Sequence, residues 1–237
     1  MLQVKSLDDI IPLNDSLVKP ILYTHVSGFD KLPVAKAKLK FISTILPSIL
    51  VAKYEIGQDQ KKTKRLRVKK IWSKADSSWF DEMKIRFKAK DTDDLIMRME
   101  TLPASIVLAQ AAMESGWGKS RIFLRANNLF GIWSYNKNEP RIAALIKRNN
   151  TRIYLKSYAD ISRSIINYFE VIGKARAYRN LREARQQTND PMMLLPHLKN
   201  YSERKTKYTK QLRTLILKND LTRYDHYQID PVYLIED

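Results

Sequence analysis

Residues 102–135 read LPASIVLAQAAMESGWGKSRIFLRANNLFGIWSY, and this stretch decides the fold. Its opening part, residues 104–115, is the most apolar segment of the chain, with Ser105 and Gln110 as the only polar side chains before its last two positions. An apolar run of helical length predicts a helix that is buried nearly all round. Glycines that predict tight turns come directly afterwards: Gly116, Gly118 and Gly131.

On both sides of this stretch, the spacing of apolar residues predicts further helices. From Leu32, apolar residues recur at three- and four-residue steps, which predicts an amphipathic helix with a kink near Pro47. The residues of this expected apolar face are Val34, Leu39, Ile42, Ile45, Leu46 and Ile49. The charged run QKKTKRLRVKK, residues 60–70, fits a solvated continuation of that helix better than a nucleic-acid patch. Shorter helices are expected at residues 79–87, 94–99, 157–173 and 174–187, from residue 190, and around residues 208–216.

Cap and turn residues divide the second half of the chain. Ser157 and Asp160 stand in capping-box positions at the start of a helix, and Gly173 is the expected C-cap of the same helix. Before that helix, residues 132–157 have weak strand character, with a turn expected at residues 149–150. We therefore expect a small β-hairpin lobe in this part of the chain.

The whole pattern predicts an α+β fold that is mostly helical. A helical lobe and a small β-hairpin lobe, with a cleft between them, are expected within a domain formed by residues 91–237. Residues 1–90 are expected to form an arm, extended over residues 1–30, followed by a helical extension.

The composition limits the classes of function that are possible. The chain has 237 residues, of which 44% are hydrophobic, so it can bury a core. Its 43 Lys and Arg residues against 25 Asp and Glu residues give a net charge of +18, which favours an anionic partner: nucleic acid, membrane headgroups or an acidic polymer. Cysteine is absent and three histidines are scattered, so we predict no metal site and no cofactor. No apolar run reaches the roughly 20 residues of a membrane-spanning helix, and the first residues lack the apolar core of a secretory signal.

Glu114 is the residue whose chemistry stands out. It ends the apolar helix on the same face as Val107 and Ala111, and it lies where the helix macrodipole disfavours negative charge. Burial and the dipole both predict a raised pKa, and a carboxylic acid that stays protonated near neutral pH can act as a general acid. The alternative is a helix-end residue that points to solvent or pairs with Lys119 or Arg121.

The residues after Glu114 have the character of a carbohydrate-binding cleft, because planar rings can stack on sugar faces and amides can bind hydroxyl and N-acetyl groups. We expect Trp133 in the cleft and Trp117 packed against Glu114. The rings could instead belong to the core, and the asparagines could be turn formers. The candidate substrate-binding residues are Trp117, Asn127, Asn128, Phe130 and Trp133.

This stretch resembles the core motif of the glucosaminidase family of peptidoglycan hydrolases (glycoside hydrolase family 73), in its Bax-like branch. The specific part of the match runs from Ala109 to Gly131, with the glutamate, then Gly-Trp-Gly, then Asn-Asn-Leu-Phe-Gly. A weaker likeness continues through SYADISRSIINYF, AYRNLREAR and YSERKTKYTKQLRTLILKNDL, so that it spans residues 91–225. The resemblance implies a lysozyme-like fold and cleavage of the β-1,4 bond between N-acetylglucosamine and N-acetylmuramic acid.

The resemblance also implies roles for individual residues. The general acid of the family falls on Glu114 and its functional tyrosine on Tyr201, with Tyr208 as the competing assignment. Some members place a second acid in the β lobe, where Glu139 is the only acidic residue between Glu114 and Asp160. If Glu139 takes part, it activates a water in an inverting mechanism. If it does not, the acetamido group of the substrate acts as the nucleophile, with Tyr201 stabilising the developing charge.

Two other functions stay open from the sequence. A lytic transglycosylase would also use one glutamate in a lysozyme-like fold, and a nucleic-acid-binding protein would account for the charge alone. Against the second, the basic residues are spread over every expected helix and no recognition motif is present. Peptidoglycan is itself anionic through its lactyl and peptide carboxylates. We therefore expect a monomer that acts on peptidoglycan glycan strands, binds no specific nucleic acid, and works in the periplasm or cell envelope of a Gram-negative bacterium if an export signal was removed.

Overall fold

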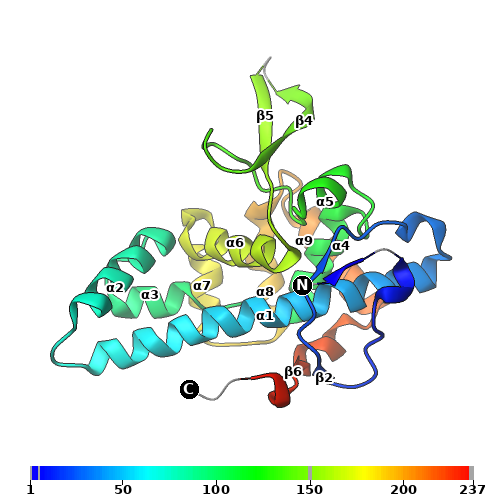
Figure 1. Ribbon diagram of the computed structural model, residues 1–237. Coiled ribbons are helices and arrows are strands. Elements are labelled where there is room, and N and C mark those ends of the chain that lie inside the picture. The colour runs from blue at the N-terminus through cyan, green and yellow to red at the C-terminus, as the bar shows by residue number, and fades with distance from the viewer. Residues whose placement is uncertain (1, 5, 149–150, 235–237) are drawn as a thin grey trace.

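The computed structural model describes residues 2–4, 6–148 and 151–234. Its helices are α1 (Val34–Val68), α2 (Lys74–Phe87), α3 (Thr92–Arg98), α4 (Ala104–Ser115), α5 (Arg121–Ala126), α6 (Ile161–Lys174), α7 (Arg179–Arg185), α8 (Pro191–Leu194) and α9 (Thr206–Lys218). The strands are β1 (Leu2–Gln3), β2 (Leu17–Val18), β3 (Tyr23–Thr24), β4 (Arg141–Arg148), β5 (Thr151–Lys156) and β6 (Gln228–Ile229). Helices make up the body, and the β4–β5 hairpin stands away from it (Figure 1). The expected α+β fold, mostly helical with a small hairpin lobe, is confirmed.

The 35-residue helix α1 runs along the body and packs against α3, α4 and α6 (Figure 1). It continues through Pro47 to Val68, so most of the charged run at residues 60–70 is a continuation of this helix, as predicted. Val34 and Leu39 were expected on its buried face, but both are exposed. Leu39 lies on the side of α1 that faces away from Phe41, whose ring packs against Phe29 and Trp117, and Val34 is the first residue of the helix.

Helix α4 is buried along most of its length, as its composition predicts. Three consecutive residues with left-handed backbone follow it: Gly116 (φ 60°), Trp117 (φ 58°) and Gly118 (φ 79°). At Gly118 an added Cβ atom would lie 2.7 Å from the ring of Phe29, so this position needs glycine for space as well as for its backbone. The Gly-Trp-Gly sequence therefore turns the chain sharply just after Glu114.

Strands β4 and β5 form the antiparallel hairpin that was expected within residues 132–157, with Arg141 opposite Lys156. The expected turn at residues 149–150 lies outside the described residues. Since the hairpin is inserted between α5 and α6, it forms a separate lobe on a mainly helical body (Figure 1).

Helix α6 does not begin with the expected capping box. Its N-cap is Asp160 alone, whose carboxylate accepts hydrogen bonds from the backbone N–H groups of Ser162 and Arg163. Ser157 still belongs to the end of the hairpin lobe, because its backbone N–H donates to the carbonyl of Pro140 (2.8 Å). The capping role predicted for Ser157 is therefore wrong.

Gly173 lies inside α6, and its predicted role as C-cap is wrong as well, because Ala175 is the C-cap. A Cβ atom at position 173 would lie 2.4 Å from the carbonyl oxygen of Arg98 and 3.0 Å from the ring of Phe87. Glycine thus allows α6 to approach α2 and α3 closely. The basic helix expected at residues 174–187 is interrupted, since a 3₁₀ turn precedes α7.

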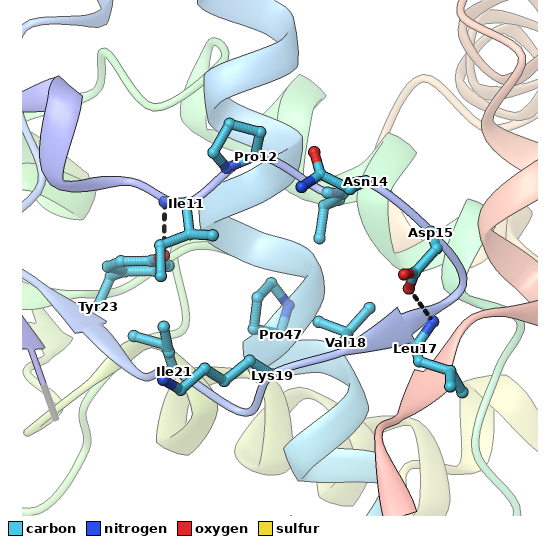
Figure 2. A pocket seen from close by; sticks show the side chains of 11 residues that line it. Ile11, Pro12, Asn14, Asp15, Leu17, Val18, Lys19, Ile21, Tyr23 and Pro47 are labelled. Carbon is cyan, nitrogen blue, oxygen red and sulfur yellow. Dashed lines mark hydrogen bonds between the residues drawn. The ribbon is translucent and has the colours of Figure 1, made fainter.

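The N-terminal arm wraps around α1 in short extended pieces. β1 pairs with β3, and β2 pairs with β6 near the other end of the chain, so the arm is tied to the C-terminal segment. Figure 2 shows the arm passing over α1 at Pro47, where the backbone N–H of Ile11 donates to the hydroxyl of Tyr23 (3.0 Å). A small pocket of about 170 Å³ remains between the arm and the helix. The arm therefore covers the point at which α1 lacks a backbone donor.

We expect Gly173→Ala to destabilise the protein, although alanine is the better helix former. The added Cβ atom would collide with the Arg98 carbonyl, and the shift of α6 should lower the free energy of unfolding by about 1–3 kcal/mol. Gly57→Ala is the matched control within α1, because no neighbouring atom lies within 4 Å of the added Cβ atom. This control should gain about 0.5–1 kcal/mol. Urea unfolding measures both variants, and effects of the same sign would contradict the packing argument.

Candidate active site

A pocket of about 620 Å³ opens between the hairpin lobe and the helical body, beside the C-terminal end of α4. Its walls come from the segment before β4, from β5, from α6, from the turn before α7 and from the segment after α8. The lining residues are Glu114, Phe130, Gly131, Ile132, Trp133, Tyr135, Lys156, Asn167, Val171, Lys174, Tyr178 and Tyr201. The cleft expected between the two lobes is therefore present, and Glu114 lies in it.

Glu114 is held by a chain of hydrogen bonds that links α6, α4 and α9. The Tyr208 hydroxyl donates to Glu114 Oε1 (2.9 Å), and the side-chain nitrogen of Gln110 donates to the Tyr208 oxygen (3.0 Å). The Tyr168 hydroxyl in turn donates to the side-chain oxygen of Gln110 (2.5 Å). Because Gln110, Tyr168 and Tyr208 are buried, each of these polar atoms needs the partner that it has. Glu114 Oε1 is thereby fixed as an acceptor.

The pKa of Glu114 is raised above its ordinary value of 4.5, as the sequence predicted. Desolvation by the surrounding protein is the main cause, and it outweighs the Tyr208 hydrogen bond and the positive charge of Arg204, which both lower this pKa. The sequence predicted a buried side chain at Glu114, and this prediction is only partly correct. Glu114 is exposed on its pocket side, because the pocket opens at the end of the helix.

Tyr201 reaches the same pocket from the segment before α9. Its ring stacks on that of Tyr208, with ring centres 5.6 Å apart and planes 13° from parallel. Desolvation raises the pKa of Tyr201 well above its ordinary value of 10.0, and the neighbouring Tyr208 and Glu114 raise it further. The hydroxyl therefore stays protonated at neutral pH. Of the two competing tyrosines, Tyr208 contacts Glu114 and is buried, whereas Tyr201 lines the pocket.

The three candidate aromatic rings lie in different places. Trp133 lines the pocket and is 37% exposed, as expected for a residue of the cleft. Phe130 also lines the pocket but is buried, and it stacks on a tyrosine of α6 at 4.4 Å between ring centres. Trp117 packs against Phe41 of α1, with ring centres 5.4 Å apart, and is not part of the pocket wall. The expected packing of Trp117 against Glu114 is therefore replaced, because the left-handed turn directs this ring toward α1.

Asn127 and Asn128 hold the hairpin lobe to the body, and the sugar-binding role suggested for them does not match their contacts. Asn127 donates to two backbone carbonyls just before α6, at 3.0 and 3.2 Å. Asn128 donates to the carbonyls of Ile132 and Lys156 and accepts from the N–H of Ile132. Both side chains are buried, and backbone groups take up their amides. Asn127 also has left-handed backbone (φ 49°), which agrees with the turn-former alternative.

Glu139 is not among the residues that line the pocket. Its carboxylate forms an ion pair with Lys156 at 2.9 Å. Desolvation raises the pKa of Glu139, but hydrogen bonds with Ser134 and Lys156 outweigh it, so the net pKa is lowered from 4.5. The structure therefore does not bring Glu139 together with Glu114 in one pocket.

The sequence did not reveal the other residues that surround Glu114. Gln110 was visible as one of two polar side chains in the apolar helix, and its place four residues before Glu114 puts both on one face. Tyr168 and Tyr178 carried no such signal, since tyrosines near an amphipathic helix are ordinary core residues. Desolvation and the charge of Glu114 raise the pKa of Tyr178 to about 12.

The pocket has one carboxylate among its described lining residues, Glu114, together with the two cations Lys156 and Lys174. Within the described ranges, no three His, Asp or Glu side chains gather in a way that could hold a metal ion. Nor is any helix in that part of the chain long and apolar enough to cross a bilayer.

The model of the family described as mannosyl-glycoprotein endo-beta-N-acetylglucosaminidase matches residues 93–221, which is more than half of the chain. The chain belongs to the glucosaminidase family. It is therefore a glycoside hydrolase, as the sequence resemblance implied. The matched part begins in α3, ends after α9 and contains every residue that lines the Glu114 pocket. A helical body, a hairpin lobe and an acid at the end of the central helix form the lysozyme-like arrangement expected of this family.

Individual relatives of the glucosaminidase are distant. Protein bax from Escherichia coli K12 is 23% identical over 196 residues, which cover 77% of this chain and 69% of that protein. The catalytic domain of the autolysin Auto from Listeria monocytogenes is 20% identical with a TM-score of 0.44, covering 70% of this chain and 96% of that one. The glycoside hydrolase domain of FlgJ from Salmonella typhimurium is 20% identical with a TM-score of 0.42, covering 60% and 89%.

We expect Tyr208→Phe to raise the pKa of Glu114 further. The substitution removes the hydroxyl that donates to Glu114 Oε1, a hydrogen bond that lowers this pKa in the glucosaminidase. Tyr168→Phe is the matched control, because it removes a hydroxyl that contacts Gln110 and not Glu114, and its effect should be smaller. Carbon-13 NMR titration of the glutamate carboxyls, assigned with Glu114→Gln, measures both shifts. An unchanged pKa in Tyr208→Phe would contradict the hydrogen-bond chain.

Proposed function

We propose that this glucosaminidase cleaves peptidoglycan at the β-1,4 bond between N-acetylglucosamine and N-acetylmuramic acid, with Glu114 as the general acid. The observation that carries the proposal is that Glu114, the one carboxyl among the described residues of the pocket, has a raised pKa and lies in a cleft whose walls include aromatic rings. The net charge of +18 supports an anionic polymer as the substrate. Peptidoglycan is such a polymer, through its lactyl and peptide carboxylates.

The hydrogen-bond chain suggests how the proton is handed over. Glu114 Oε1 accepts from Tyr208, so Oε2 is left to carry the acid proton toward the glycosidic oxygen. The raised pKa keeps more of the carboxyl protonated near neutral pH than an ordinary glutamate would be. After the transfer, Tyr208 and Arg204 favour the ionised form, since both lower the pKa of this carboxyl. The carboxylate then accepts a proton from the water whose oxygen adds to the anomeric carbon and displaces the acetamido oxygen, which restores the acid and leaves a free reducing end.

For the opposite face of the sugar, we assign the nucleophile to the acetamido group of the substrate. Tyr201 lines the pocket together with Glu114, and we propose that it stabilises the charge that develops as the acetamido oxygen attacks. Glu139 is a poorer candidate, because its carboxylate is paired with Lys156 and Glu139 does not itself line the pocket. Substrate assistance is a recognised exception to the two-carboxylate pattern. Trp133 is the exposed ring on which we expect a sugar face to stack.

The alternatives differ from this proposal in measurable products. The proposed reaction leaves N-acetylglucosamine at the new reducing end, whereas a lytic transglycosylase leaves anhydromuramic acid. Family membership does not favour a nucleic-acid-binding protein. Analysis of the reducing ends in digested peptidoglycan separates the two enzymes.

A peptidoglycan substrate also implies where the protein works in the cell. We propose a location in the periplasm or cell envelope of a Gram-negative bacterium, and we propose that the protein acts as a monomer. We further propose that residues 91–237 form the catalytic domain and that residues 1–90 brace it. Helix α1 supports this division, because it packs against α4 and α6, the helices that carry Glu114 and Tyr168.

We expect Glu114→Gln to abolish cleavage while the fold is kept. Glutamine keeps the shape of the side chain and can still accept from Tyr208, but it cannot hand over a proton. Because general-acid catalysis is worth about 10²–10⁴-fold, the loss of turnover should be at least of that order. Digestion of purified peptidoglycan measures it. A variant that melts normally and still digests the polymer would remove Glu114 from the mechanism.

The same variant reports on stability. The pKa of Glu114 is higher in the folded protein than in the unfolded chain, so the wild type loses stability as pH rises through the folded pKa. Glu114→Gln should therefore melt at a higher temperature than the wild type at neutral pH. This advantage should disappear below the ordinary pKa of 4.5. Thermal melts as a function of pH test the sign of this stability difference. A variant that is more stable than the wild type only at acid pH would contradict the prediction.

We expect Tyr201→Phe to lower kcat by about 10²-fold, the size typical for loss of one group that acts in the transition state. Its effect on KM should be small, because the ring that lines the pocket is kept. Glu139→Gln should change kcat much less, since its carboxylate lies outside the pocket wall. Steady-state kinetics on soluble glycan strands measure both variants. A larger loss in Glu139→Gln than in Tyr201→Phe would favour the inverting mechanism.

A further inference from the structure

A second pocket, of about 560 Å³, adjoins the C-terminal end of α4 between α1 and α9. We call it the cationic groove. Its apolar lining comes from Met113, Trp117 and Leu215. No carboxylate occurs among the described residues that line it, and its cations are Lys38, Arg204, Lys207, Lys210 and Lys218. Of these charges, the proposed acid-catalysed step uses only that of Arg204, and the four lysines have no part in it.

Most of the cations in the groove stand on one face of α9. Lys207, Lys210 and Lys218 follow one another at spacings of three and eight residues, which places them along one side of the helix. All three are exposed. The other side of α9, with Leu212 and Ile216, is buried in the core. The helix is therefore anchored by its apolar face and presents a row of charges to the groove.

Helix α1 completes the groove from outside the part of the chain that matches the family. Lys38 donates to the side-chain oxygen of Asn219 (2.8 Å), and its ammonium group lies 5.0 Å from the centre of the Trp117 ring. Since the family match begins at residue 93, this cation is added by the N-terminal helix. Helix α1 therefore contributes Lys38 to the wall of the groove.

Arg204 connects the cationic groove with the catalytic carboxyl. Its guanidinium group lies 3.6 Å from the sulfur of Met113 and 5.6 Å from the centre of the Tyr208 ring. Tyr208 is the residue that donates to Glu114. The groove and the acid are thus separated by a single layer of side chains.

We propose that the cationic groove binds the acidic peptide that branches from the muramic acid next to the cleaved bond. This inference rests on the proposed function. The peptide is attached to the sugar through a lactyl group, so it must lie close to Glu114 while the bond is in place. Its carboxylates match the cations of the groove, and its apolar parts match Trp117, Met113 and Leu215.

The double variant Lys210→Gln/Lys218→Gln tests the groove without touching the catalytic machinery. The substrates are glycan strands that carry their peptides and the same strands after the peptides have been removed by an amidase. On peptide-bearing strands, KM should rise by about 2- to 30-fold, the range expected for loss of two exposed ion pairs. On stripped strands KM should be nearly unchanged, and kcat should be unchanged on both.

Lys61→Gln/Lys64→Gln is the matched control, because it removes two exposed lysines from the far part of α1. It should leave KM unchanged on both substrates. A rise in KM for the control as well, or an equal rise on stripped strands for the groove variant, would overturn the proposal. Either result would show that non-specific electrostatic attraction to the glycan strand causes the effect.

A binding measurement separates this inference from the proposed function. A soluble muramoyl peptide with free carboxylates should shift the NMR signal of the Trp117 indole N–H, and Lys210→Gln/Lys218→Gln should weaken the effect. A wild type that shows this shift but cleaves neither substrate would refute the proposed function, but it would support peptide binding in the cationic groove. Cleavage without any shift, or a stronger response to a duplex DNA of equal charge, would overturn the groove.

Discussion

The hydroxyl of Tyr208, on α9, donates to the carboxyl of Glu114, on α4, and this bond joins residues that are 94 positions apart in the chain. Gln110 and Tyr168 extend the contact to α6, so that three helices meet through side chains that are buried in the core. Removal of one link would leave a buried polar group without a partner, at a cost of about 1–3 kcal/mol. The same hydrogen bonds therefore fix both the packing of the three helices and the position of the acid.

A second constraint places the hairpin lobe beside the acid. The three left-handed residues that follow α4 reverse the chain directly after Glu114, and the close approach of Gly118 to Phe29 ties this reversal to the N-terminal arm. Asn128 then joins the backbone on both sides of the hairpin, through Ile132 and Lys156. Because the lobe is held at its base, Trp133 lies in the wall of the cleft. The glycines and asparagines of the motif thus shape the cleft, and they do so without exposed polar groups.

The sequence by itself determined the features that depend on neighbours along the chain. The apolar composition of residues 104–115 predicted the buried central helix, and the residues after it predicted a turn followed by a hairpin lobe. The position of Glu114 at the end of this helix predicted a raised pKa. Local composition and spacing were enough for the helix and the turn, because these involve residues only a few positions apart. The pKa prediction had the right direction, but desolvation by the surrounding protein is its main cause.

Only the tertiary structure decided which partners each side chain has. It separated the two tyrosines, giving Tyr208 the contact with the acid and Tyr201 a place in the wall of the cleft. It showed that Trp117 packs on α1 and that Gly173 serves a helix crossing and not a cap. The physical reason is the same in each case: the partner comes from a distant part of the chain. No local pattern specifies such a contact, because it depends on how whole helices pack against one another.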